Sequence, residues 1–80
     1  MPDQQIELTA YSGSRGEEIP RSFILAGEKV DAVSILDMWM EEESAERRRK
    51  RFYKVKGSDG YTHTVYYDET EKRWFLGKTG

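Results

Sequence analysis

The segment from residue 51 to residue 76 constrains the fold most, because apolar and polar residues alternate along it at the period of a β-strand. Its first turn signal is Ser58-Asp59-Gly60, which suits a three-residue hairpin loop with Gly60 in the left-handed conformation. This register sets Tyr53 opposite Val65. A two-residue turn at Ser58-Asp59 would instead mix polar and apolar residues on both faces. The longer loop is therefore predicted.

The two faces of this hairpin differ in character, and a second hairpin with a four-residue loop at residues 69–72 extends both. The predicted core face carries Tyr53, Val55, Tyr61, His63, Val65, Tyr67, Trp74 and Leu76. The opposite face carries three aromatic residues at adjacent positions on three strands: Phe52, Tyr66 and Phe75.

The whole chain is predicted to be all-β, a small antiparallel meander curled into an SH3-like open barrel. Alternation and turn residues place strands at residues 6–11, 22–26, 29–36, 51–57, 61–68 and 73–77. Gly27-Glu28 is expected as a turn. A bulge near Ala32 or Val33 is expected, because the apolar residues change parity there.

The domain organisation follows from length and local composition. Eighty residues without cysteine form one small domain over residues 1–80 that hydrophobic packing alone must stabilise. Within it we expect a frayed segment at 1–5, a flexible loop at 12–20 and a charged excursion at 41–50 with a short helical turn. Residues 34–50 are ambiguous, since their composition favours a helix whereas their apolar residues stop at Met40. A helix of three or more turns there would make the fold α+β.

Overall charge and hydropathy indicate which partners and which cellular location to expect. The net charge of −2 argues against strong nonspecific DNA binding by the domain as a whole. The apolar runs are too short to span a bilayer, and the acidic N-terminus does not resemble a secretory signal. We therefore expect a cytoplasmic protein without a membrane partner.

Residues suited to catalysis are few. His63 has neither a cysteine to activate nor a second histidine with which to share a metal. The acidic residues Asp37, Glu41 and Glu42 lack the ligand loop of a calcium site, and no glycine-rich phosphate loop is present. The expectation is a non-enzymatic protein with no catalytic residues, no metal and no cofactor.

Binding is the more informative hypothesis. Aromatic side chains on an outer sheet face, flanked by bases, are typical of single-stranded nucleic-acid platforms. The candidate binding residues are Arg47, Arg48, Arg49, Lys50, Arg51, Phe52, Lys54, Tyr66 and Phe75. Two alternatives stay open. Either the N-terminal strand or the segment around Trp39 covers the aromatic residues as a second layer of core, or the basic run only keeps the chain soluble beside the acidic residues 37–46.

The aromatic and turn residues of the C-terminal half also suggest a family. "RRKRFYKVKGSDG" and "TVYYDETEKRWFL", with "GEKVDAVSILDMW" upstream, resemble a small bacterial domain that occurs alone or at the C-terminus of ImuB-like relatives of Y-family DNA polymerases. The matching residues are Arg51, Phe52, Tyr53, Val55, Asp59, Gly60, Tyr66, Trp74, Phe75 and Leu76. The resemblance implies a bacterial binding module whose partner is single-stranded DNA or a DNA-repair protein. A protein-interaction or structural module without nucleic-acid binding is the alternative.

Overall fold

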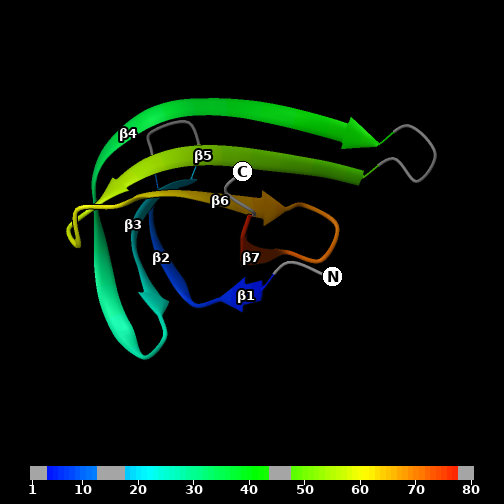
Figure 1. The fold of residues 1–80 in the computed structure, drawn as a ribbon. Helices are drawn as coiled ribbons and strands as arrows, with labels where there is room; N and C mark the ends of the chain where they lie inside the picture. The colour runs from blue at the N-terminus through cyan, green and yellow to red at the C-terminus, as the bar shows by residue number, and fades with distance from the viewer. Residues whose placement is uncertain (1–3, 13–17, 44–47, 78–80) are drawn as a thin grey trace.

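Seven strands of one antiparallel sheet make up the fold (Figure 1). The computed structural model describes residues 4–12, 18–43 and 48–77. The strands are β1 (Gln4–Ile6), β2 (Leu8–Ser12), β3 (Glu18–Leu25), β4 (Glu28–Glu43), β5 (Arg48–Gly57), β6 (Thr62–Asp68) and β7 (Arg73–Leu76). No helix occurs in these three ranges, so the predicted all-β class is confirmed.

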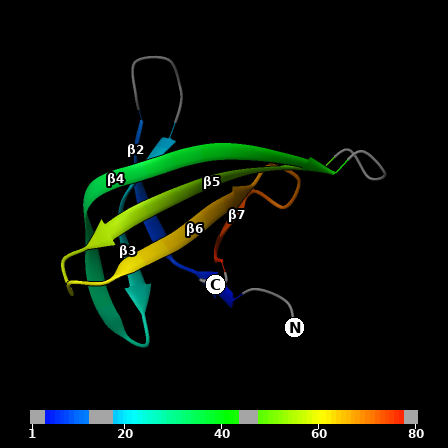
Figure 2. The ribbon, with the colours of Figure 1, turned by 45° about the horizontal axis from the view of Figure 1, so that its top comes forward.

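The N-terminal segment curls the sheet into a small SH3-like barrel (Figure 2). The strand order is β1-β7-β6-β5-β4-β3-β2, so the two ends of the sheet are consecutive in the chain and only Glu7 separates them. The backbone carbonyl of Glu7 accepts a hydrogen bond from the amide of Ile24 at 3.0 Å. One strand, bent at Glu7, therefore pairs with β7 on one side and with β3 on the other.

The core fills the concave side of the curled sheet. Its buried members come from six strands: Ile6, Phe23, Val30, Tyr53, Val55, Val65 and Trp74. Val55 and Val65 are fully enclosed, and Leu76 packs against them at the rim. The predicted core of the C-terminal hairpins is thus confirmed.

Both predicted hairpin registers are confirmed. Tyr53 pairs with Val65, and the Gly60 amide donates to the Gly57 carbonyl at 3.0 Å, with Gly60 at a φ of 88°. In the next hairpin Tyr66 pairs with Phe75. Glycine at position 60 matches the left-handed conformation that the three-residue loop requires.

Tyr61 is a correction to the predicted core face, because 70% of its surface is exposed. It precedes β6 and lies at the end of the hairpin, where its carbonyl accepts from the amide of Gly57 at 2.8 Å. A Cβ at position 57 would lie 2.6 Å from Asp59 Oδ1 and 2.8 Å from Val30 Cγ1. Gly57 therefore presents no side chain against which Tyr61 could pack.

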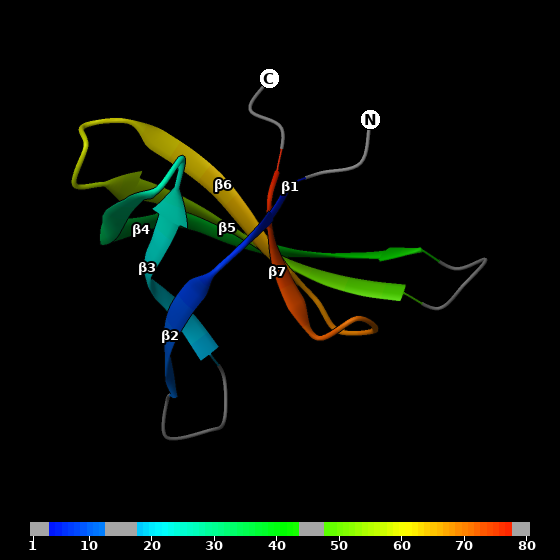
Figure 3. The ribbon, with the colours of Figure 1, turned by 90° about the horizontal axis from the view of Figure 1, so that it is seen from below.

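Strand β4 is longer than predicted and carries two irregularities. Its pairing with β5 shifts between Ala32 and Ser34, as predicted, and again between Ile35 and Asp37, which the sequence pattern did not indicate. Each bulge adds a residue to one strand and bends it. The result is a strand whose first part closes the barrel and whose second part projects beyond it with β5 (Figure 3).

Three predicted boundaries are wrong. The expected excursion at 41–50 is strand at 41–43 and 48–50, because each acidic residue there pairs across the ladder with a basic one. The expected loop at 12–20 is strand at residue 12 and from Glu18, since Pro20 lies beside the register shift in the β2–β3 ladder, where a missing amide is tolerated. Gln4 and Gln5, expected to be frayed, pair with β7.

The hairpin between β3 and β4 also turns one residue earlier than predicted. Leu25 pairs with Glu28, so the turn residues are Ala26 and Gly27, with φ of 51° and 82°. Two positive φ angles define a type I′ turn, which matches the twist of the flanking strands. Alanine is unfavourable in this conformation because its Cβ crowds the backbone.

We expect Ala26→Asn to raise the free energy of unfolding by about 1 kcal/mol, because asparagine tolerates the left-handed conformation. Urea denaturation of the variant and the wild type measures this change. Glu28→Asn, at a strand position without positive φ, is the control and is expected to bring no gain. An unchanged midpoint for Ala26→Asn would contradict the type I′ turn.

Candidate binding surfaces

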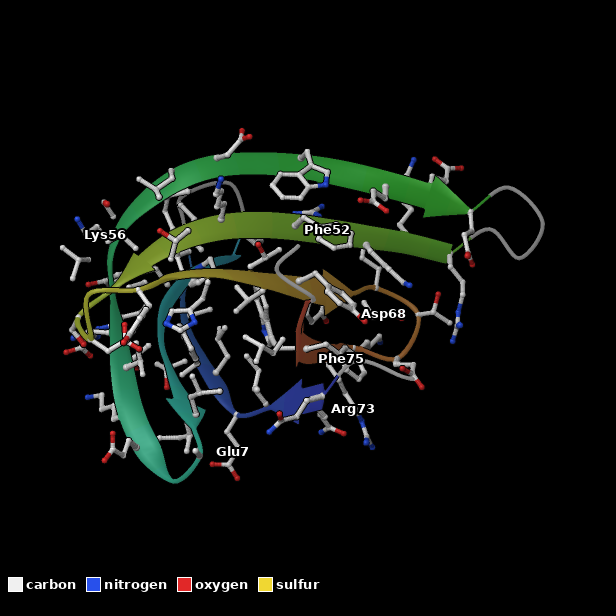
Figure 4. The ribbon with its side chains drawn as sticks, viewed as in Figure 1. Glu7, Phe52, Lys56, Asp68, Arg73 and Phe75 are labelled. Carbon is white, nitrogen blue, oxygen red and sulfur yellow. The ribbon has the colours of Figure 1, made fainter. Side chains whose placement is uncertain are left out.

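Four aromatic side chains lie in a line on the convex face of the sheet, and we name them the aromatic row: Trp39 on β4, Phe52 on β5, Tyr66 on β6 and Phe75 on β7. Strand pairing aligns them, because Trp39 pairs with Phe52, and Tyr66 pairs with both Phe52 and Phe75. Figure 4 shows Phe52 and Phe75 on this face. Trp39 was not among the candidate residues, since the bulges in β4 hide its parity in the sequence.

The rings of the aromatic row stack on one another. Ring centroids are 5.3 Å apart for Trp39 and Phe52, with only 7° between the planes. They are 4.8 Å apart for Phe52 and Tyr66, at 32°, and 5.3 Å apart for Tyr66 and Phe75, at 20°. These separations follow the spacing of neighbouring strands. The Trp39–Phe52 and Tyr66–Phe75 pairs are stacked, and the Phe52–Tyr66 pair between them is tilted. The faces of Phe52 and Tyr66 are therefore occupied.

Exposure along the aromatic row is lowest at Tyr66 and highest at Trp39, at the β4 end. Tyr66 is buried, Phe52 and Phe75 are half-buried, and Trp39 is 37% exposed. The Trp39 ring is held in place by a hydrogen bond of 3.0 Å that its Nε1 donates to Glu41. The segment around Trp39 therefore does not cover the aromatic residues, as one alternative from the sequence proposed, but extends them by one strand.

Strand alternation divides the basic run between the two faces of the sheet. Arg48 and Lys50 are an even number of residues from Phe52 and belong to the convex face. Arg49 and Arg51 alternate with them and belong to the opposite face. Arg47 lies outside the described residues. The run is therefore not a single surface with the aromatic row.

Acidic partners lie opposite most of these bases. Glu41, Glu42 and Glu43 pair in the ladder with Lys50, Arg49 and Arg48, and Arg49 lies 3.7 Å from the carboxylate of Glu42. Lys54 pairs with Asp37. Alternating signs across the ribbon leave little net positive charge for phosphates.

Two bases make more specific contacts. Arg51 donates from Nε to Glu69 at 2.8 Å, and this bond raises the pKa of Arg51 above its usual value. The ammonium of Lys50 lies 5.3 Å from the centre of the Tyr66 ring. Arg51 thus ties β5 to the β6–β7 loop, and Lys50 is the base most closely joined to the aromatic row.

A further surface, which sequence reasoning missed, is the edge of β4 over residues 32–43. Strand β3 pairs with β4 only at residues 28–31, and β5 takes one edge of the remainder. Within the described part of the chain no strand pairs with the other edge, which we name the free edge. The sequence did not indicate this edge, because it follows from the length of β4 and from the residue at which β3 stops pairing with it.

The side chains along the free edge are largely apolar and exposed. Val33 is 65% exposed, Met38 56%, Leu36 51% and Met40 49%. Beside them lies a hollow of about 250 Å³ lined by Met38, Trp39, Met40, Arg51, Phe52 and Tyr53. Exposed apolar side chains beside such a hollow are typical of an interaction site.

The single histidine lies in a structural cluster at the β5–β6 loop. Its Nε2 is 2.9 Å from Asp59 Oδ2, and its ring meets Phe23 edge-on with centroids 5.3 Å apart. Asp59 Oδ1 also accepts from the Tyr61 amide at 3.0 Å. The amide of Tyr61, followed by His63, holds the pKa of Asp59 below its ordinary value of 3.8. These contacts order the loop.

Metal-ligating groups and membrane spans were sought in residues 4–12, 18–43 and 48–77. No group of three or more histidine, cysteine or acidic side chains there is arranged to hold a metal ion. Asp37 and Glu41 belong to the convex face and Glu42 to the other, which separates the acidic residues noted in the sequence. No helix in these ranges is long and apolar enough to cross a membrane.

Comparison with the models of protein families, with curated proteins and with solved structures gives no match to this chain. The relation to the domain of ImuB-like polymerase relatives therefore stays a prediction.

The Asp59 contacts predict how stability depends on pH. Because the pKa of Asp59 is lower in the folded chain, its ionised form stabilises the fold above the ordinary pKa of 3.8. This contribution is lost as the pH falls through the folded-state pKa. Asp59→Asn should therefore lower the free energy of unfolding near neutral pH, and the difference from wild type should shrink below about pH 4. Urea denaturation across this range tests it, and a difference independent of pH would contradict it.

Proposed function

We propose that this chain is a non-enzymatic protein-binding module whose partner adds an extended segment to the free edge of β4. The observation that carries the proposal is that β4 continues through residues 32–43 with strand pairing on one side only in the described structure. Backbone donors and acceptors along such an edge are a template for another strand. Main-chain hydrogen bonds would supply affinity.

The side chains beside this edge support a protein partner. Met38 and Met40 are exposed on the same side of β4, next to the hollow that Tyr53 and Arg51 also line. Methionine is flexible and polarisable, which suits it to contact surfaces that adapt to a partner. Alternate side chains of an added strand would fill the hollow and give specificity.

Single-stranded nucleic acid is the second candidate, favoured by Lys50 and Lys54 on the same face as the aromatic row. Two observations rank it lower. The inner rings stack on one another, so a base can stack only on the end rings, Trp39 and Phe75. The basic side chains of β5 also lie opposite acidic residues on β4, so they are less available to phosphates.

The biological setting stays a prediction from the sequence. The resemblance to ImuB-like polymerase relatives implies single-stranded DNA or a bacterial DNA-repair protein as the partner, and composition implies the cytoplasm; of the two partners, strand addition favours the protein. Strand addition is compatible with such a partner, because it needs only an extended segment in the other protein.

Selection from a random library of dodecapeptides displayed on phage tests strand addition. We expect enriched peptides to shift the amide NMR signals of residues 33–43, with binding at least about tenfold weaker in a Met38→Lys, Met40→Lys double variant. Tyr61→Lys, which changes an exposed aromatic residue in the β5–β6 loop, is the matched control and should bind as wild type. Shifts confined to Phe52 and Phe75 would contradict the proposal.

Titration of the ¹⁵N-labelled protein with a short oligothymidine tests the second candidate. We expect small chemical-shift changes near Trp39 and Phe75 at low salt only. The binding constant should fall by about 0.7 logarithmic unit per phosphate contact for each decade of salt concentration. Lys54→Glu should abolish the chemical-shift changes, whereas Lys29→Glu, in the β3–β4 hairpin, should not. Tight binding at physiological salt would make nucleic acid the principal ligand.

A further inference from the structure

The aromatic row ends at the free edge of β4. Trp39 is its last ring, with one face stacked on Phe52 at 5.3 Å and 7°. No strand of the described chain pairs with β4 on the far side of Trp39. The ring remains 37% exposed even though Glu41 holds its indole nitrogen. A strand added to the edge would lie one strand spacing beyond Trp39, where one more aromatic ring continues the stack.

We infer that the added strand is β4 of a second copy of this chain, paired antiparallel about a two-fold axis at Trp39. This inference rests on the proposed strand addition and names its partner. Trp39 of one copy then stacks on Trp39 of the other, and two aromatic rows become one. An edge whose own side chain supplies the missing ring is self-complementary, as a two-fold interface requires.

The regular part of β4 fits this pairing. Residues 37–43 follow the second bulge and keep an unbroken register with β5. A two-fold axis at Trp39 sets Met38 of one copy opposite Met40 of the other, on the opposite face from the tryptophans. Both methionines are about half exposed, at 56% and 49%. The pairing therefore covers the exposed side chains on both faces of the projecting ribbon.

The charges favour the antiparallel direction. A parallel pair would set the acidic residues 41–43 of both copies side by side, and like charges directly opposite are destabilising. The antiparallel pair leaves one such contact on each side of the axis, Asp37 against the partner's Glu41. Each of these carboxylates already has a lysine across the β4–β5 ladder, Lys54 and Lys50 respectively.

A short pairing of this size is a weak interface. Only residues 37–41 pair without crossing a bulge, so we expect a dissociation constant on the order of 100 µM. Sedimentation equilibrium of the full chain from about 10 µM to about 2 mM brackets that value. The wild type should pass from monomer to dimer as the concentration rises. No larger species should form, because the two-fold pairing occupies the free edge of both copies.

Matched variants test which residues form the interface. Trp39→Lys should raise the dissociation constant at least about tenfold, and Tyr61→Lys should change it less than about twofold. Asp37→Asn should lower it by about two- to fivefold, because it removes the like-charged contact with the partner's Glu41. Dimers that Trp39→Lys leaves unchanged would overturn the inference.

Cysteine pairs test the register, since the chain has no cysteine of its own. In the Trp39-centred pairing, a mixture of Met38→Cys and Met40→Cys chains should form disulfide dimers under mild oxidation, because opposite Cα atoms lie about 4.5–5.5 Å apart. Either variant alone should cross-link much more slowly, since its cysteines are diagonal, about 7–8 Å apart. Faster cross-linking of Met38→Cys alone would overturn the Trp39 axis.

The outcome also separates this inference from the proposed function. A wild type that stays monomeric to about 2 mM while selected peptides still bind at residues 33–43 would overturn the second copy as partner and leave strand addition standing. A monomer that also binds no peptide would overturn both.

Discussion

The antiparallel pairing of β4 with β5 positions the core, the aromatic row and most of the charged side chains. It runs from Ala32 to Glu43 on one strand and from Arg48 to Gly57 on the other, across two register shifts. Because opposite residues share a face, this ladder sends Val55 into the core and sets Phe52 beside Trp39 on the convex side. It also sets three acidic residues opposite three residues of the basic run, because the same register brings Glu41–Glu43 opposite Arg48–Lys50. Core, aromatic row and charge balance thus follow from one register.

A small chain without disulfides gains a second apolar layer from this arrangement. The concave face packs residues such as Phe23, Val55 and Trp74 into the core. On the convex face the stacked rings bury Tyr66 to 5% exposure. Cross-strand aromatic pairs each add roughly 0.2–1 kcal/mol relative to alanine pairs. Rings that look like a base-stacking platform in the sequence are therefore also part of what holds the sheet together.

The same geometry shifts the functional interpretation from nucleic acid toward protein. A nucleic-acid platform needs open ring faces and uncompensated bases, whereas here the inner rings face one another and Arg51 is bound to Glu69. In the described structure, the backbone groups available for binding lie on the edge of β4 beyond Asp31, where β3 no longer pairs with it. Proteins commonly protect such edges with proline or lysine. Neither residue occurs in β4 after Lys29. This edge does carry two bulges and the acidic residues Asp37 and Glu41–Glu43, which are also protective features, and the exposed Met38 and Met40 lie between those acids.

The all-β class, both C-terminal hairpin registers and the first bulge of β4 could be predicted from the sequence, because alternation and Gly60 are local signals that act over a few residues. The sequence also aligned Phe52, Tyr66 and Phe75 correctly. Three features appear only in the folded chain: Trp39 joins the aromatic row, the charged residues 41–43 and 48–50 form strand, and β4 keeps a free edge. These features depend on the second bulge of β4 and on the residue at which β3 stops pairing with β4. Both depend on pairing between strands that are far apart in the sequence, so a local pattern of residues does not predict them.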